Sequence, residues 1–184
     1  KVVIAGHSEG SLIGMVASRK SSAVKAYISI AGCGRPAYEV IEEQLKRQPE
    51  QVQREAAAIN RELREGHTTD DVPHYLAPLY RKSVQPYLIS WFKYNPAKEI
   101  AKLKIPVLIL QGEKDIQVGV KEAEKLRMAR ILSSYYTIPD MNHVLKHCTS
   151  NDMVSQLETY RNPHLPVKEE LIGHIVRFIK NRQP

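Results

Sequence analysis

The chain contains 184 residues, of which 42% are hydrophobic and 26% are charged. This is enough for one packed domain and too little for two independent ones, and no apolar run reaches the length of about 18 residues that predicts a membrane-spanning helix. The net charge is +7, but the cations alternate with glutamates along segments such as 42–47 and 121–125, the pattern of solvated helix faces. We therefore expect neither a membrane span nor a nucleic-acid partner.

The chain begins with an apolar segment, without a starting methionine or the layout of a signal peptide. We interpret it as the C-terminal part of a longer domain, so the upstream half of that domain is an expected partner. The sequence indicates neither a compartment nor an oligomeric state. Cys33 and Cys148 lack metal-ligand spacing, so two free thiols are favoured, with a single disulfide between them as the alternative.

Strand and helix patterns alternate at both ends of the chain. Short apolar or β-branched runs predict strands, and helical spacing of apolar residues predicts helices. The predicted strands are residues 2–5, 24–31, 106–111 and 133–138, and the predicted helices are residues 8–20, 118–130 and 167–181. Strands separated by helices predict an α/β class with a mostly parallel sheet flanked by helices.

The composition changes between residues 35 and 95, where strand signals vanish. Four apolar residues share one face of a predicted helix that ends at Gly66, and prolines divide the remainder into short pieces. The four are Val52, Ala56, Ile59 and Leu63. We predict a helical cap at 35–95, inserted into a core made of residues 1–34 and 96–184.

The pattern G-x-S-x-G joins the first predicted strand to the first predicted helix, in Gly6-His7-Ser8-Glu9-Gly10. In this context Ser8 is expected on a sharp, strained turn, and the two glycines would let the strand and the helix pass closely. The helix N-terminus favours developing negative charge, and the backbone N–H of Glu9 is the expected oxyanion-hole donor. The alternative is a glycine-rich turn with a helix-capping serine.

A serine nucleophile needs a base and an orienting carboxylate, here expected in loops after later strands. Asp115 follows the predicted strand 106–111, and such a sheet places its site residues at the carboxyl ends of strands. Glu113 is the competitor, but Gly112 is expected to let the loop turn toward Asp115. Asp115 could also serve as the N-cap of the next helix.

His143 follows the predicted strand 133–138 and completes the order Ser, acid, His. His147, four residues later, is its rival. His7 lies inside the elbow motif and is expected to point away from the site. The other histidines belong to the predicted cap or to the last loop and helix: His67, His74, His164 and His174.

With Ser8, Asp115 and His143 in this order, the chain resembles the α/β-hydrolase superfamily. Within that superfamily, the amino-acid sequence is similar to the serine aminopeptidase-like and esterase/lysophospholipase-like branch in three stretches, at residues 6–10, 106–115 and 142–143. The resemblance does not extend to the cap, which sets substrate choice in that family. Ser11 departs from the pattern, because many relatives have a second glycine there.

The resemblance implies a serine hydrolase that cleaves a carboxylic ester of a small-molecule acyl substrate, with no metal and no cofactor. Amide or peptide hydrolysis, and a non-catalytic binding protein with this fold, are the alternatives. Tyr87 and Trp91 of the cap are candidates for a substrate pocket, although aromatic residues at helical spacing more often form core.

The resemblance also implies strands before the elbow and a second oxyanion donor from an earlier loop, and residues 1–184 contain neither. Losing one such donor costs about 10² to 10³ in rate. We therefore expect these residues alone to be poorly active.

Overall fold

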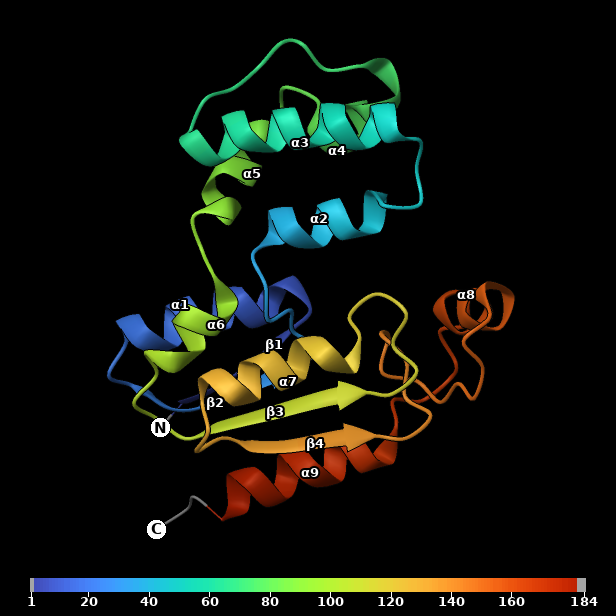
Figure 1. The fold of residues 1–184 in the computed structure, drawn as a ribbon. Helices are drawn as coiled ribbons and strands as arrows, with labels where there is room; N and C mark the ends of the chain where they lie inside the picture. The colour runs from blue at the N-terminus through green and yellow to red at the C-terminus, as the bar shows by residue number, and fades with distance from the viewer. Residues whose placement is uncertain (1, 182–184) are drawn as a thin grey trace. The chain divides into compact units, whose positions relative to one another are not determined.

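Residues 2–181 are described by a computed structural model (Figure 1). The chain divides into two compact units. The sheet unit is Lys1–Gly34 with Pro96–Pro184, and the helical unit is Arg35–Asn95. Each unit has its own hydrophobic core.

The sheet unit is built on four parallel strands in the order β1-β2-β3-β4. They are β1 (Val2–His7), β2 (Val24–Ile30), β3 (Val107–Gly112) and β4 (Ser134–Ile138). All six residues of β3 are buried, as expected for a strand covered on both faces. The predicted α/β class with a parallel sheet flanked by helices is therefore confirmed.

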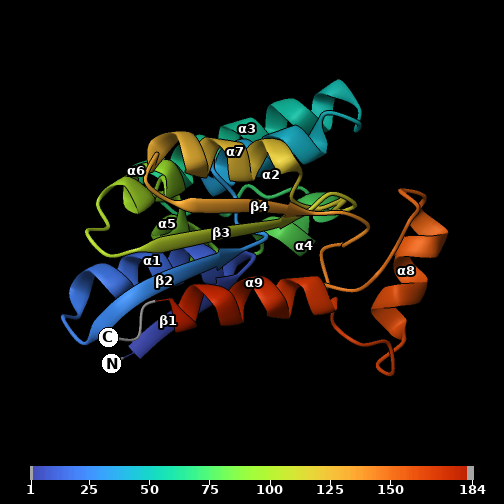
Figure 2. The same ribbon diagram turned by 90° about the horizontal axis from the view of Figure 1, so that it is seen from below.

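Helices cover both faces of this sheet. On one side lie α1 (Glu9–Lys20), α6 (Pro96–Ala101) and α7 (Val120–Ala129), and on the other lies α9 (Glu169–Lys180), as the views in Figures 1 and 2 agree. Side chains of strand β2 pack against helices on both faces of the sheet. Ala26, Ile28 and Ile30 belong to the core that includes Leu171 and Phe178 of α9.

The alternate residues of β2 face α1. The hydroxyl of Tyr27 donates to the backbone oxygen of Ser11 at 2.6 Å, and the hydroxyl of Ser11 lies 2.7 Å from that of Ser29. Burial raises the pKa of the Tyr27 hydroxyl above its usual range. Ser11, at the position where many proteins of the similar family have a second glycine, thus links α1 to the sheet.

The helical unit contains α2 (Ala37–Leu45), α3 (Glu50–Glu65), a 3₁₀ turn (His74–Leu76), α4 (Ala77–Tyr80) and α5 (Gln85–Phe92). Helix α3 ends at Gly66 as predicted, because Gly66 has φ 91° and its N–H bonds the last turn. Three residues of its predicted apolar face, Ala56, Ile59 and Leu63, are buried in the core of this unit, where Val52 packs against them. Tyr80 is also buried there and donates to Asn60 at 2.9 Å.

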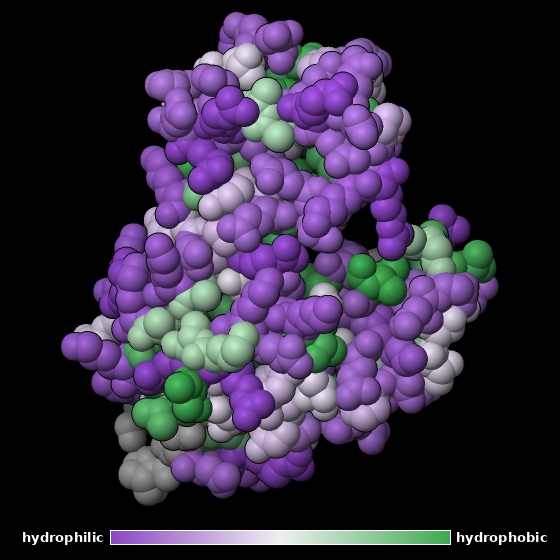
Figure 3. Space-filling view, in the orientation of Figure 1, coloured by the Kyte–Doolittle hydropathy of each residue, from purple (hydrophilic) through white to green (hydrophobic). Residues whose placement is uncertain are grey.

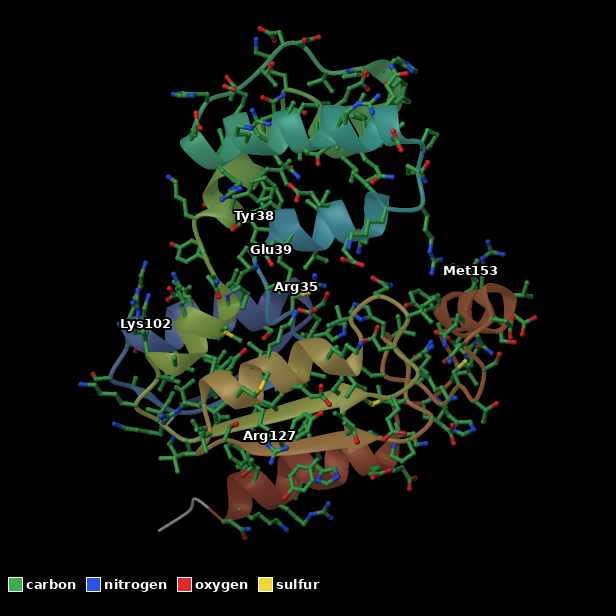
Figure 4. The ribbon with its side chains drawn as sticks, viewed as in Figure 1. Arg35, Tyr38, Glu39, Lys102, Arg127 and Met153 are labelled. Carbon is green, nitrogen blue, oxygen red and sulfur yellow. The ribbon has the colours of Figure 1, made fainter. Side chains whose placement is uncertain are left out.

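Helix α8 (Met153–Arg161) was not among the predicted elements. Its N-cap is Asp152, whose carboxylate accepts the N–H of Ser155 at 2.9 Å. Hydrogen bonds from the Ser150 hydroxyl and from Ser155 lower the pKa of Asp152 to about 2. The helix lacks a buried apolar stripe, since Met153, labelled in Figure 4, is 61% exposed, so hydrophobic periodicity could not reveal it.

On the face drawn in Figure 3, polar residues predominate and hydrophobic residues form small separate groups. No helix within residues 2–181 has the length and apolar character needed to cross a bilayer. No disulfide joins Cys33 and Cys148, so the alternative of a disulfide between them is wrong.

Candidate active site

Ser8 lies between β1 and α1 in a backbone conformation that non-glycine residues rarely adopt, with φ 55° and ψ −122°. Such a conformation costs on the order of 1–3 kcal/mol and persists only where its surroundings impose it. The backbone N–H of Ser8 donates to the oxygen of Ile30 at 2.9 Å. A Cβ on Gly6 would lie 2.2 Å from the oxygen of Gly10, so the turn requires glycine at position 6.

Two other glycines have roles that differ from those expected. A Cβ on Gly10 would meet no described atom within 4 Å, so close packing does not explain that glycine. A Cβ on Gly112 would lie 2.2 Å from the backbone oxygen of Met141. Gly112 therefore admits the close approach of the neighbouring loop, and it is not among the residues with positive φ.

The structure brings Ser8, Asp115 and His143 into one hydrogen-bonded series. Nε2 of His143 lies 3.1 Å from Oγ of Ser8, and Nδ1 lies 2.8 Å from Oδ2 of Asp115. Because an ionised carboxylate only accepts hydrogen bonds, Nδ1 carries the proton and Nε2 is left to accept from the serine hydroxyl. Asp115 and His143 are both buried, whereas Ser8 is half-buried and accessible.

The carboxylate of Asp115 is held by hydrogen bonds on both oxygens. Oδ1 accepts the backbone N–H groups of Gln117 and Val118, each at 2.8 Å, and Oδ2 accepts Nε2 of Gln111 at 3.1 Å. Asp115 therefore caps the turn that follows it, while Gly119 is the N-cap of α7, so the expected helix-capping role is wrong.

Glu113 and His147, the alternative candidates for the acid and the base, do not join the hydrogen-bonded series. Glu113 is exposed and accepts a hydrogen bond from Thr137 at 2.9 Å. His147 is exposed, and its Nδ1 lies 3.3 Å from Nζ of Lys168. His143, in contrast, lies in the loop that follows β4, which contains Asp140 at φ 52°.

His7 does not point away from the site, so that expectation is wrong. Its Nε2–H donates to the backbone oxygen of His143 at 2.8 Å, and the two rings lie 4.9 Å apart. Desolvation lowers the pKa of His7 and the bond to the carbonyl of His143 opposes that shift, so the neutral ring is favoured at neutral pH. Its position directly before the nucleophile was the only sequence signal for this contact.

Glu9 begins α1, so its backbone N–H belongs to the first turn, whose donors have no acceptor within the helix. Tyr87 and Trp91 lie in the helical unit, with ring centroids 5.6 Å apart. Tyr87 is exposed, and Trp91 packs half-buried against the core of that unit.

One group within residues 2–181 could hold a metal ion by geometry, at the end of α3 in the helical unit. Its ligand atoms, from Glu62, Glu65 and His67, lie within 4.8 Å of one another. All three side chains are exposed, and His67 lies 3.7 Å and 3.8 Å from the two carboxylates. Exposed ion pairs of this kind need no metal, and the group is not part of the hydrogen-bonded series.

A parallel sheet with a strained serine after β1, an acid after β3 and a histidine after β4 defines the α/β-hydrolase class of fold. No protein-family model matches the chain, and no curated protein sequence matches it either.

Among solved structures, the whole chain is similar to two structures from Mycobacterium tuberculosis. One is Rv0554, with 15% identity, a TM-score of 0.54 and 66% of that protein covered. The other is BpoC of strain H37Rv, a candidate non-heme bromoperoxidase, with 14% identity, a TM-score of 0.53 and 68% covered. The chain thus spans about two thirds of their length, and it has the fold of the α/β-hydrolase superfamily.

Proposed function

We propose that the protein is a serine hydrolase that cleaves carboxylic esters through an acyl-enzyme on Ser8. The observation that carries this proposal is the series from Ser8 Oγ to His143 Nε2 at 3.1 Å and from His143 Nδ1 to Asp115 at 2.8 Å. A serine hydroxyl is a weak nucleophile, and this series supplies the base and the carboxylate that orients the base.

In the proposed reaction, Oγ of Ser8 attacks the acyl carbon while Nε2 of His143 takes the hydroxyl proton. The tetrahedral intermediate collapses, the bond to the leaving oxygen breaks, and His143 returns the proton to the departing alcohol. Water then attacks the acyl-enzyme by the same route, releasing the acid and restoring Ser8. Asp115 keeps the proton on Nδ1 throughout and stabilises the imidazolium that forms.

The backbone N–H of Glu9 would stabilise the oxyanion of the intermediate. Two features support this role: Glu9 directly follows the strained serine, and its N–H belongs to the unpaired donors of the α1 N-terminus. A preorganised donor of this kind contributes about 10² to 10³ in rate.

A fluorophosphonate probe tests the assignment of Ser8 in the full-length protein, because the probe phosphonylates only an activated serine. We expect the wild type to be labelled at the peptide that contains Ser8, and Ser8→Ala to lose the label. Ser21→Ala, at an exposed serine after α1, is the matched control and should label like the wild type. Labelling that survives in Ser8→Ala would remove Ser8 from the mechanism.

Substrate class is tested with a series of p-nitrophenyl esters and the matching anilides. The ester proposal expects turnover of the esters and much slower turnover of the anilides. Faster anilide cleavage would instead identify an amidase or peptidase. A folded protein that turns over neither series and takes no probe would be a binding protein with this fold.

The helical unit, Arg35–Asn95, is the proposed cap and the proposed determinant of acyl choice. The neighbouring aromatic rings of Tyr87 and Trp91 are its candidates for contact with substrate. If they contact the acyl chain, Tyr87→Ala should raise KM for long-chain esters and leave short-chain esters unaffected. Equal effects on both would assign Tyr87 a structural role only.

A further inference from the structure

Helix α8 reaches both loops of the site through buried polar side chains. Nε2 of Gln156 donates at 2.9 Å to the backbone oxygen of Lys114, the residue before Asp115. Nδ2 of Asn142, the residue before His143, donates at 2.6 Å to the hydroxyl of Thr159. Gln156, Thr159 and Asn142 are all buried, so these bonds are shielded from competing water.

The two contacts are joined within one turn of the helix. The hydroxyl of Thr159 donates at 2.7 Å to the backbone oxygen of Gln156. Nζ of Lys146, in the histidine loop, donates at 2.9 Å to the backbone oxygen of Thr159. A displacement of this turn would therefore be felt at both loops.

Hydrophobic burial does not explain the position of α8. Met153 and Val154 are 61% and 70% exposed, and the buried residues of the helix are Gln156 and Thr159. Figures 1 and 2 both place α8 beside the loops at the carboxyl ends of β3 and β4, outside the layers that cover the sheet faces. The helix is thus held chiefly by its hydrogen bonds to the two loops.

We propose that α8 is a clamp that fixes the spacing of Asp115 and His143, with Thr159 and Gln156 as positioning residues. This proposal rests on the proposed function of the same site. The clamp acts on geometry: a misplacement of about 1 Å in a catalytic group can cost about 10² in rate. Neither residue takes part in the hydrogen-bonded series itself, so their loss should lower kcat and leave KM nearly unchanged.

The clamp is tested in the full-length protein with Thr159→Val, which replaces the hydroxyl by a methyl group of similar size. We expect kcat on a p-nitrophenyl ester to fall about 10-fold, with KM within about twofold. Thr159→Ser keeps the hydroxyl and should restore kcat to within about threefold of the wild type. Thr137→Val is the matched control, because it removes the hydroxyl whose bond to Glu113 is exposed.

Three results would overturn the clamp: unchanged kcat in Thr159→Val, equal damage in Thr159→Ser, or an effect on KM alone. A second variant, Lys146→Met, removes bonds from the histidine loop to α8 nearer the surface and should lower kcat about threefold. An unchanged kcat in Lys146→Met would also count against the clamp.

A separate measurement distinguishes this proposal from the proposed function. The proton on Nδ1 of His143, bonded to Asp115, should give a downfield NMR resonance that shifts in Thr159→Val and stays in Thr137→Val. If the wild type is inactive but the resonance shifts in Thr159→Val, the hydrolase proposal is refuted and the clamp proposal stands. An active wild type whose resonance does not respond to Thr159→Val would refute the clamp alone.

Discussion

Replacing Asp115 by asparagine should abolish the proposed turnover by reversing the imidazole tautomer. If the new NH₂ group took the place of Oδ1, it would oppose two backbone donors, the N–H groups of Gln117 and Val118. In the place of Oδ2 it opposes only one, Nε2 of Gln111, and it can donate to Nδ1 of His143. The second placement is favoured, and it leaves the proton on Nε2, where Ser8 needs an acceptor.

The expected magnitude follows from these bonds. A reversed tautomer costs about 10⁴ in kcat in a triad of this kind, and one unsatisfied buried donor costs about 1–3 kcal/mol of unfolding free energy. Ester turnover measures the first quantity and guanidinium unfolding the second. Glu113→Gln, at the exposed competitor, is the control and should change neither by much. If Asp115→Asn kept more than a tenth of the wild-type kcat, the orienting role of Asp115 would be refuted.

The remaining predictions concern the base, the elbow and the core. His143→Ala should lower kcat about 10⁴-fold or more, whereas His147→Ala, at an exposed ring, should stay within about twofold; the reverse order in a turnover assay would exchange their roles. Gly6→Ala should cost about 2–3 kcal/mol in a denaturant melt, because its Cβ would lie 2.2 Å from a backbone oxygen of α1. Gly119→Ala, where a Cβ meets no described atom within 4 Å, should cost less than about 0.5 kcal/mol, and equal losses would contradict the steric argument. The raised pKa of Tyr27 keeps it protonated in the native state while the unfolded chain loses that proton above its usual pKa of about 10. Tyr27 should therefore contribute a fall in the free energy of unfolding of up to about 1.4 kcal/mol per pH unit above pH 10, and Tyr27→Phe should make the slope shallower by that contribution; a Phe variant with the wild-type slope would contradict the assignment.

The strands and the larger helices were predictable because hydrophobic burial leaves a regular trace in the sequence. Ala26, Ile28 and Ile30 alternate with residues that face α1, and the apolar face of α3 repeats at helical spacing. Helix α8 left no such trace, since polar bonds hold it in place. In the sequence of a polar helix, the capping residue is the only indication of where the helix begins. For α8 that weak signal was Asp152, whose carboxylate accepts the N–H of Ser155 in the structure.

The candidate site was predictable as far as chemistry and strand order determine it. Ser8, Asp115 and His143 each follow a strand, and a parallel sheet brings such loops to one edge. The contact of His7 with the His143 carbonyl was not predictable, because it depends on side-chain direction across two loops. The true roles of Gly10 and Gly112 were hidden for the same reason: the need for a missing Cβ depends on a neighbour distant in sequence.

The geometry of the site belongs to the sheet edge as a whole more than to any single loop. Four described non-glycine residues have positive φ, and all follow strands at this edge: Ser8, Ala31, Asp140 and Leu145. Each of these backbone conformations costs on the order of 1–3 kcal/mol, so contacts with the surrounding structure must stabilise it. Backbone bonds continue the ladder beyond the strands and link each loop to the next, from Ser8 to Ile30, from Ala31 to Leu110 and from Lys114 to Met141. Because these bonds join the loops in sequence, a shift in one loop must distort the next. This coupling explains how residues 135 positions apart in sequence can hold a 3.1 Å contact between Ser8 and His143.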